Sequence, residues 1–235
     1  AGIVYGSDES IDFVDELFYT MWVAALEASC DQAMEHGAYE NFNAERYAAT
    51  NEFLVLKEHE PELADDILTY GLRNASLLTV APTGTVGTML DRSTGIEPHY
   101  AFEYERTSRL GTHKIRPQIA EGKDLSDPVF VTAQTLTPDE HLSVLVAAQT
   151  WVDSSISKTV NLPANASVFD VQKLYFEAWR NGVKGITVYR DGSRHEQVLS
   201  VEKPVAQTCE ECGGELVYQE GCATCNQCGA SFCSV

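Results

Sequence analysis

The chain has 235 residues, 44% of them hydrophobic and 22% charged, which is enough to bury a core and leave room for a small appended module. Its 35 acidic against 16 basic residues give a formal net charge of −19, which disfavours direct binding to nucleic acid or to an anionic membrane surface. The sequence contains no run of about eighteen apolar residues and no secretory signal, so we expect a cytoplasmic protein.

Two helices are predicted in the first third of the chain. Apolar residues recur at helical spacing over 10–35, where Ser7 can cap the helix and Gly37 can end it. Cys30 falls in this apolar pattern, so we interpret it as a small buried hydrophobe. A second helix is expected over 61–70, because proline suits the first helical turn.

Strands and helices then alternate. The apolar run 77–80 predicts a buried strand, and a capping box formed by Thr137 and Glu140 predicts a helix over 138–153. An extended stretch at 157–162 follows.

Ser167 then begins a further helix, with Val171, Leu174, Tyr175, Ala178 and Trp179 expected to face inward. A strand is predicted over 185–189. Such alternation is typical of an α/β domain whose strands are covered by helices.

The loop after the first predicted strand has features of an anion site. It reads Ala81-Pro82-Thr83-Gly84-Thr85-Val86-Gly87, in which glycine allows close backbone approach and the threonines offer hydroxyl donors. A short helix beginning near Thr85 would add the positive end of its dipole. The same residues are also typical of a simple turn, so local features leave both interpretations open.

The surrounding segments resemble ribonucleotide reductases. Gly71-Leu72-Arg73-Asn74-Ala75 precedes the loop, and Gly95-Ile96-Glu97-Pro98 follows it. The resemblance implies the C-terminal part of a ten-stranded α/β barrel, in which this loop holds the phosphates of the ribonucleotide substrate. The contacts it implies are Ala81, Thr83, Gly84, Thr85 and Val86, with Gly95, Ile96, Glu97 and Pro98 lining the barrel mouth. A structural role for Glu97 stays open.

Later segments look like the adenosylcobalamin-dependent branch of that family, class II. These segments are 156–163 and 184–194. Class I members carry adjacent tyrosines where this chain has Thr187 and Val188, so the class I radical relay lacks its carrier. The resemblance implies adenosylcobalamin as radical source, and conversion of ribonucleoside diphosphates or triphosphates to deoxyribonucleotides for DNA synthesis.

The C-terminal segment is rich in cysteine. Cys209 and Cys212 form one Cys-x-x-Cys-Gly knuckle and Cys225 and Cys228 another, a spacing typical of tetrahedral zinc sites. A competing frame uses Cys222 with Cys225 as the second knuckle. We predict a small zinc-ribbon-like tail.

Cys222 and Cys233 remain outside this zinc set. A surplus pair beside a closed metal site suggests thiol–disulfide exchange. The resemblance implies a use for this pair. Family members re-reduce their active site through mobile C-terminal cysteines, which receive electrons from a thioredoxin- or glutaredoxin-type reductant. The alternative, that all six tail cysteines are metal ligands or incidental, stays open.

We therefore expect three regions: a portion of the catalytic barrel over 1–189, a flexible linker over 190–207 and a metal or redox tail over 208–235. The radical-bearing and substrate-reducing cysteines of the family belong to motifs absent from this sequence. We expect the chain alone to be inactive and to require the N-terminal part of the reductase, in the same chain or as a split partner, with a homodimer as one possible assembly. The alternative function is a non-catalytic zinc-ribbon adaptor on an α/β scaffold.

Overall fold

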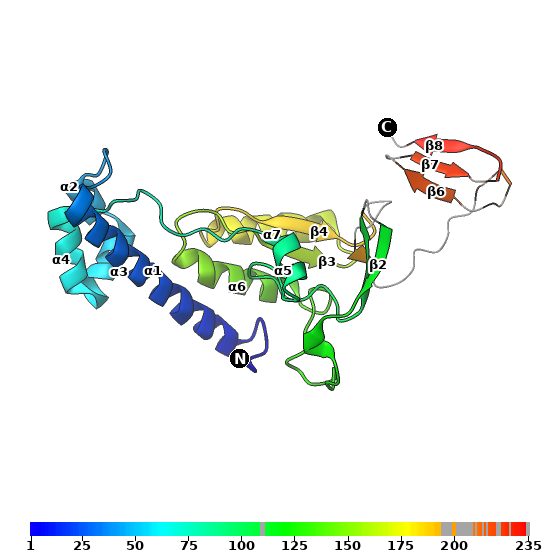
Figure 1. Ribbon diagram of the computed structural model, residues 1–235, viewed down its shortest axis with the longest axis horizontal. Helices are drawn as coiled ribbons and strands as arrows, with labels where there is room; N and C mark the ends of the chain where they lie inside the picture. Colours follow the sequence, from blue (N-terminus) through cyan, green and yellow to red (C-terminus); the bar gives the residue numbers. More distant parts are fainter. Residues whose placement is uncertain are drawn as a thin grey trace.

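A computed structural model of the chain describes residues 1–108, 111–193, 199–200, 209, 211–212, 214, 216–219, 222–225 and 227–233. Helices gather at one end, helices and parallel strands form the middle, and a small antiparallel sheet is formed near the C-terminus (Figure 1).

Four helices make up the N-terminal region: α1 (Asp8–His36), α2 (Ala44–Ala48), α3 (Asn51–His59) and α4 (Pro61–Tyr70). The helices predicted over 10–35 and 61–70 are confirmed, whereas α2 and α3 were not predicted. Their core joins α1, α3 and α4 through the buried residues Trp22, Leu26, Cys30, Phe53, Leu56, Ala64 and Ile67.

The middle of the molecule contains α6 (Pro138–Thr150), β3 (Thr159–Leu162), α7 (Val168–Arg180) and β4 (Thr187–Arg190). The two strands pair in parallel, with Thr159 opposite Thr187. A second core cluster includes Phe18, Leu142, Leu145, Ala148, Val160, Leu162, Leu174 and Ala178. It contains residues of α1 because α1 packs along α6.

Capping residues explain where α6 and α7 begin. Thr137 accepts a hydrogen bond from the Glu140 amide, and the Glu140 carboxylate accepts one from the Thr137 amide, so the predicted capping box is confirmed. Ser167 and Asp170 form the equivalent box at the start of α7. Each box satisfies amide groups that a helix start leaves without intrahelical partners.

The strand predicted over 77–80 is wrong as a regular element. Only Val80 makes a β-bridge, in parallel to Ile156. The amide groups of Leu77 and Leu78 donate to the Asp153 carboxylate rather than to a neighbouring strand, both at 2.9 Å. The segment therefore runs beside 153–157 without forming a ladder.

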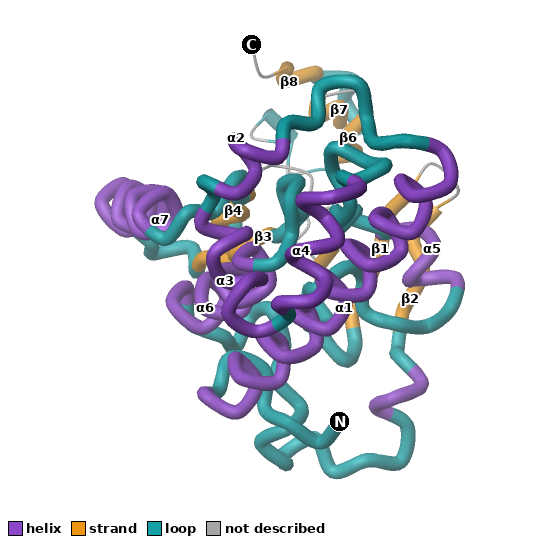
Figure 2. Tube along the Cα trace, turned by 90° about the vertical axis from the view of Figure 1, so that its left-hand side faces the viewer, coloured by secondary structure: helices purple, strands orange, loops and turns teal. Residues whose placement is uncertain are grey.

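The prediction that Tyr175 and Trp179 face inward is also wrong. Val171, Leu174 and Ala178, spaced by three and four residues, occupy the face of α7 that packs on the core. Tyr175 and Trp179, each one position after a core residue, point away from the core, and Trp179 is 73% exposed. Figure 2 shows α7 at the edge of the molecule.

A three-stranded antiparallel sheet, which was not predicted, lies beyond the parallel strands. It contains β1 (Tyr104–Ser108), β2 (Gly111–Ile115) and β5 (Leu199–Ser200), with β1 in the centre. β5 falls within the stretch expected to be a linker, and it pairs with Glu105 and Arg106 of β1. Two short helices complete this region, α5 (Gly84–Met89) and the 3-10 helix η1 (Gln118–Ala120).

The cysteine-rich segment forms its own antiparallel sheet of β6 (Leu216–Gln219), β7 (Cys222–Cys225) and β8 (Ser231–Cys233), with β7 in the centre. The described residues thus form an α/β structure that does not close into a barrel. Over the same residues, no helix combines the length and apolar character needed to cross a bilayer.

Candidate functional site

The predicted anion loop, residues 81–86, is exposed throughout, and its last three residues form the start of α5. The helix predicted to begin near Thr85 begins at Gly84. Thr83 precedes it with φ of 44°, a left-handed conformation that is uncommon for a residue other than glycine. Helix geometry leaves the first amide groups of α5 without intrahelical acceptors, so they can serve an external anion.

The 81–86 loop is tied directly to the second predicted segment, the 95–98 loop. The Thr83 hydroxyl oxygen accepts a hydrogen bond from the Gly95 amide at 3.1 Å, which leaves its own proton available for a ligand. Gly95 has φ of 54°, and a Cβ at this position would lie 3.3 Å from the Ala81 carbonyl oxygen. The structure thus brings the two loops together.

A hollow opens beside these loops, between the 79–82 segment and the residues that lead into β3 and β4. Its lining consists mainly of small residues: Thr79, Val80, Ala81, Pro82, Ser155, Ile156, Ser157, Gly185, Ile186 and Thr187. This side of the two parallel strands therefore stays open to a further group.

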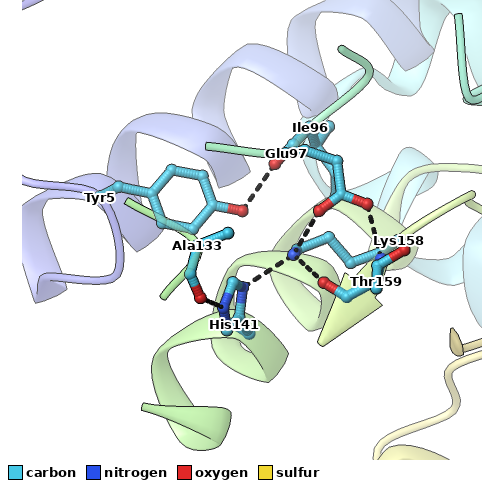
Figure 3. A network of polar contacts seen from close by, with 7 residues as sticks. All are labelled: Tyr5, Ile96, Glu97, Ala133, His141, Lys158 and Thr159. Atoms are coloured by element: carbon cyan, nitrogen blue, oxygen red, sulfur yellow. Dashed lines mark hydrogen bonds and ion pairs between the residues drawn. The ribbon is translucent and has the colours of Figure 1, made fainter. Parts of the chain in front are cut away.

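Beneath the 95–98 loop lies a buried polar network (Figure 3). One Glu97 oxygen accepts from the Thr159 amide at 2.6 Å, and the other accepts from the Lys158 ammonium at 2.9 Å. Lys158 also donates to His141 Nδ1 at 2.8 Å and to the Thr159 carbonyl at 2.7 Å. All three protons of the ammonium group therefore have acceptors.

Burial shapes the protonation of this network. It lowers the pKa of His141 to about 4, an effect strengthened by the positive charge of Lys158. The imidazole is therefore neutral at neutral pH; Nδ1 accepts from Lys158 and Nε2 carries the proton, which faces the Ala133 carbonyl oxygen at 3.2 Å. Burial also lowers the pKa of Lys158, against the opposing effect of Glu97.

Tyr5 approaches the network from the N-terminus of the chain. Its hydroxyl donates to the Ile96 carbonyl at 2.6 Å and so holds the 95–98 loop from the opposite side (Figure 3). Burial, with Glu97 nearby, raises the pKa of this phenol above its usual range. Tyr5 is therefore a hydrogen-bond donor at neutral pH.

Lys158, His141 and Tyr5 were not predicted from the sequence, although a signal for Lys158 exists. Ile156, Lys158, Val160 and Leu162 alternate along one extended stretch, and all four are buried. A lysine on the buried face of a strand requires a counter-charge. Glu97, for which both a barrel-mouth position and a structural role had been considered, provides it.

In the tail, four cysteines converge, and they are those of the first predicted frame. The sulfur atoms of Cys209, Cys212, Cys225 and Cys228 all lie within 4.8 Å of one another. Hydrogen bonds from the amide groups of Cys228 and Gln227 lower the pKa of Cys225 to about 6, whereas hydrogen bonding to the neighbouring thiols raises the pKa of Cys212 and Cys228 against the lowering effect of backbone amides. The chemistry and the spacing of the set fit a tetrahedral metal ion.

The two remaining tail cysteines occupy opposite positions on neighbouring strands, because Cys222 of β7 pairs with Cys233 of β8. The Cys225 amide donates to the Ala230 carbonyl, which makes 225 and 230 a hydrogen-bonded pair. Pairs alternate along an antiparallel ladder, so 222 and 233 form a non-hydrogen-bonded pair, the kind with the shorter Cα separation. Directly opposite residues lie close to the spacing that a disulfide needs.

Comparison with known proteins gives one family match and a set of relatives. The family model described as "Ribonucleotide reductase, barrel domain" matches residues 1–189. The chain is 33% identical over 251 residues to a Mycobacterium tuberculosis protein named "Vitamin B12-dependent ribonucleoside-diphosphate reductase", covering 94% of this chain and 32% of that protein. It is 32% identical over 176 residues to a Streptomyces avermitilis "Vitamin B12-dependent ribonucleotide reductase", covering 60% of this chain and 18% of the relative.

A relative whose name does not mention the cofactor is also similar. The Mycoplasma pneumoniae "Ribonucleoside-diphosphate reductase subunit alpha" is 29% identical over 242 residues, which cover 89% of this chain and 33% of that protein. The chain thus spans about a third or less of the length of these relatives.

Proposed function

Because the chain belongs to the ribonucleotide reductase family, whose barrel domain it matches over residues 1–189, we propose that it forms the C-terminal part of a reductase that converts ribonucleotides to deoxyribonucleotides. In this proposal the 81–86 loop binds the phosphates of the substrate. The remaining part of the catalytic barrel comes from the rest of the reductase, in the same polypeptide or as a separate subunit.

The observation that carries the proposal is the pairing of the 81–86 and 95–98 loops beside the open hollow. The loop offers backbone amide groups at the start of α5 and the hydroxyls of Thr83 and Thr85, all on an exposed surface. It needs no lysine for this, since amide groups at a turn and a helix start attract anions by themselves. The other implied contacts, Ala81, Gly84 and Val86, would contribute through their backbone.

Adenosylcobalamin is the proposed cofactor, since several relatives are named as vitamin B12-dependent. When bound, it would supply the radical chemistry of the reaction. The small residues that line the hollow, such as Ser155 and Gly185, leave that side of the strands accessible to a ligand.

The tail is proposed to bind zinc through Cys209, Cys212, Cys225 and Cys228. The convergence of the four sulfur atoms supports this set over the frame that uses Cys222. A closed set of four thiolates is typical of a structural rather than a catalytic zinc site.

Cys222 and Cys233 are proposed to carry electrons to the active site. Their thiols would reduce the active-site disulfide by exchange, so that two thiols form there while a disulfide forms between Cys222 and Cys233. A thioredoxin- or glutaredoxin-type dithiol would then restore the tail pair and become a disulfide itself. The register of β7 and β8 supports the pairing of these two residues.

The test is anaerobic conversion of ribonucleotide to deoxyribonucleotide by the full-length reductase, with and without adenosylcobalamin. Product that depends on the cofactor is expected. No product with any reductant, from a folded protein that retains its metal, would favour the alternative of a non-catalytic zinc-ribbon adaptor.

The phosphate loop is tested by replacing both Thr83 and Thr85 with valine in the same protein. Hydrogen bonds to charged groups contribute about 1.5–3 kcal/mol each, so removing two of them should raise the dissociation constant for a ribonucleoside diphosphate by about 100-fold or more. Thr150→Val is the matched control, because the Thr150 hydroxyl bonds within α6. Unchanged affinity in the double variant would remove the phosphate role of this loop.

A further inference from the structure

Lys158 is the largest fully buried side chain of the described residues, and it carries a charge into the core. Its side chain is 0% exposed, and that of its partner Glu97 is 19% exposed. The ammonium group has three acceptors, namely Glu97, His141 and the Thr159 carbonyl. A lysine is rarely buried without such partners, because removing an unpaired charge from water is costly.

Stability alone gives a weak account of this arrangement. Removing two charges from water is costly, and replacing a buried ion pair by apolar residues of similar volume is often neutral or stabilising. Buried ionic groups can instead select one conformation among several that the chain could adopt. We therefore expect Lys158 to hold a particular segment of the chain in place.

That segment is the 95–98 loop, which has no ladder or helix to fix it. Glu97 fastens the loop to the start of β3 through Lys158 and through the Thr159 amide. On its other side the loop meets the phosphate loop, because the Gly95 amide donates to Thr83.

The contacts thus form one continuous path from the core to the candidate substrate site. It runs from Lys158 to Glu97, through the backbone to Gly95, and from Gly95 to the Thr83 hydroxyl. Thr83 holds an uncommon left-handed conformation, which persists when its surroundings fix it. Gly95 lies so close to Ala81 that a displacement of the 95–98 loop would also move the phosphate loop.

We propose that Lys158 is a positioning residue for substrate binding: by holding Glu97, it fixes the 95–98 loop and so sets the geometry of Thr83 in the phosphate loop. This role rests on the proposed function of the 81–86 loop. It assigns Glu97 to the support of the loop rather than to contact with substrate. His141 completes the arrangement as the neutral acceptor for the third proton of the ammonium group.

The experiment measures binding of a ribonucleoside diphosphate and steady-state kinetics in the full-length reductase carrying Lys158→Met. The variant should lose the hydrogen bond of a correctly placed Thr83 to a charged phosphate, so we expect the dissociation constant and KM to rise by roughly 10- to 100-fold. The turnover number should change less, since the affected interaction is with phosphate in both ground and transition states.

Lys57→Met is the matched control. Lys57 also pairs with a carboxylate, that of Asp65, but the pair lies on the surface of the N-terminal helices. This variant should bind and turn over substrate as the parent does. Glu97→Gln is the second test variant, because it keeps the size of the side chain and serves if Lys158→Met does not fold.

A double-mutant cycle with Thr83→Val separates the outcomes. If Lys158 acts through Thr83, the combined variant should lose little more affinity than the weaker-binding single variant. Additive losses, or normal affinity in folded Lys158→Met and Glu97→Gln, would overturn the positioning role while leaving the phosphate loop intact. Normal affinity in Thr83→Val together with weak affinity in Lys158→Met would overturn both the phosphate loop and this route to it.

Discussion

At the scale of single residues, we predict that the free energy of unfolding depends on pH through His141. Its pKa is lowered to about 4 in the folded chain, from an ordinary value of 6.5. The unfolded chain therefore takes up the proton first as the pH falls, so the stability contributed by neutral His141 is full above about pH 6.5 and is lost between there and about pH 4. One pKa unit corresponds to about 1.4 kcal/mol, so the loss is at most about 3 kcal/mol.

Urea unfolding of the chain between pH 7.5 and pH 5 measures this effect. The free energy of unfolding should fall with pH in the parent and fall less steeply in His141→Gln, which keeps a polar side chain beside Lys158 and Glu140. His36→Gln is the control, because His36 lies exposed at the end of α1 beside Glu35. Parallel profiles for the parent and His141→Gln would show that His141 does not carry the dependence.

Residue roles were predictable where the local pattern alone decides them. Cys30 lies in an apolar helical pattern, and its predicted burial is confirmed. Lys158 and His141 lie far apart in sequence from Glu97, and only the fold brings the three together. The alternation of buried positions around Lys158 could have indicated a buried charge, but not which residues satisfy it.

At the scale of elements, predictions succeeded where capping residues and apolar periodicity agree. The starts of α6 and α7 follow from Thr137 and Ser167 with their capping partners. The strand over 77–80 failed because the side chain of Asp153, distant in sequence, takes the amide groups that a neighbouring strand would use. The strand β5 could not be predicted because its pairing with β1 joins segments about ninety residues apart, whereas β1 and β2 pair locally and were missed.

At this scale we predict that the sheet of β6, β7 and β8 depends on bound metal for its folding. If the four converging cysteines bind zinc, the metal supplies most of its folding energy, since structural sites contribute about 10–16 kcal/mol in small domains. A chelator or Cys212→Ser should therefore unfold this sheet and release the metal, while α1 to α7 keep their unfolding transition. Metal analysis together with amide NMR spectra would measure both effects.

Cys233→Ser is the matched control for the metal, because Cys233 is not one of the four proposed ligands. It should retain one zinc ion per chain. Loss of zinc from this variant, or its retention in Cys212→Ser, would contradict the proposed ligands.

At the scale of the whole molecule, the chain matches only one part of the length of its relatives. The sequence indicated an α/β protein, and the alternation of α6, β3, α7 and β4 agrees with this. The described strands do not close a barrel, and the chain spans about a third of its M. tuberculosis relative. Closure of a barrel depends on strands that pair across its whole circumference, which one part of the sequence cannot specify.

The proposed electron delivery by the tail is tested in the full-length reductase. Cys233→Ser in the full-length reductase should abolish repeated turnover with a thioredoxin-type donor, because no tail disulfide can form. Activity with a small dithiol such as dithiothreitol should remain, since that reductant can enter the active site directly. Equal loss with both reductants would indicate a structural role for Cys233.

The pairing of β5 with β1 limits the distance that such a tail can travel. Leu199 and Ser200 are held by Glu105 and Arg106, so the tether to the first zinc-ligand candidate, Cys209, begins at Ser200 rather than at Arg190. The intervening stretch 201–208 spans at most roughly 30 Å when fully extended, less than half the reach of a tether starting at the end of β4. If the tail carries electrons as proposed, the location of the β1–β2 pair relative to the active site therefore decides whether Cys222 and Cys233 can reach it.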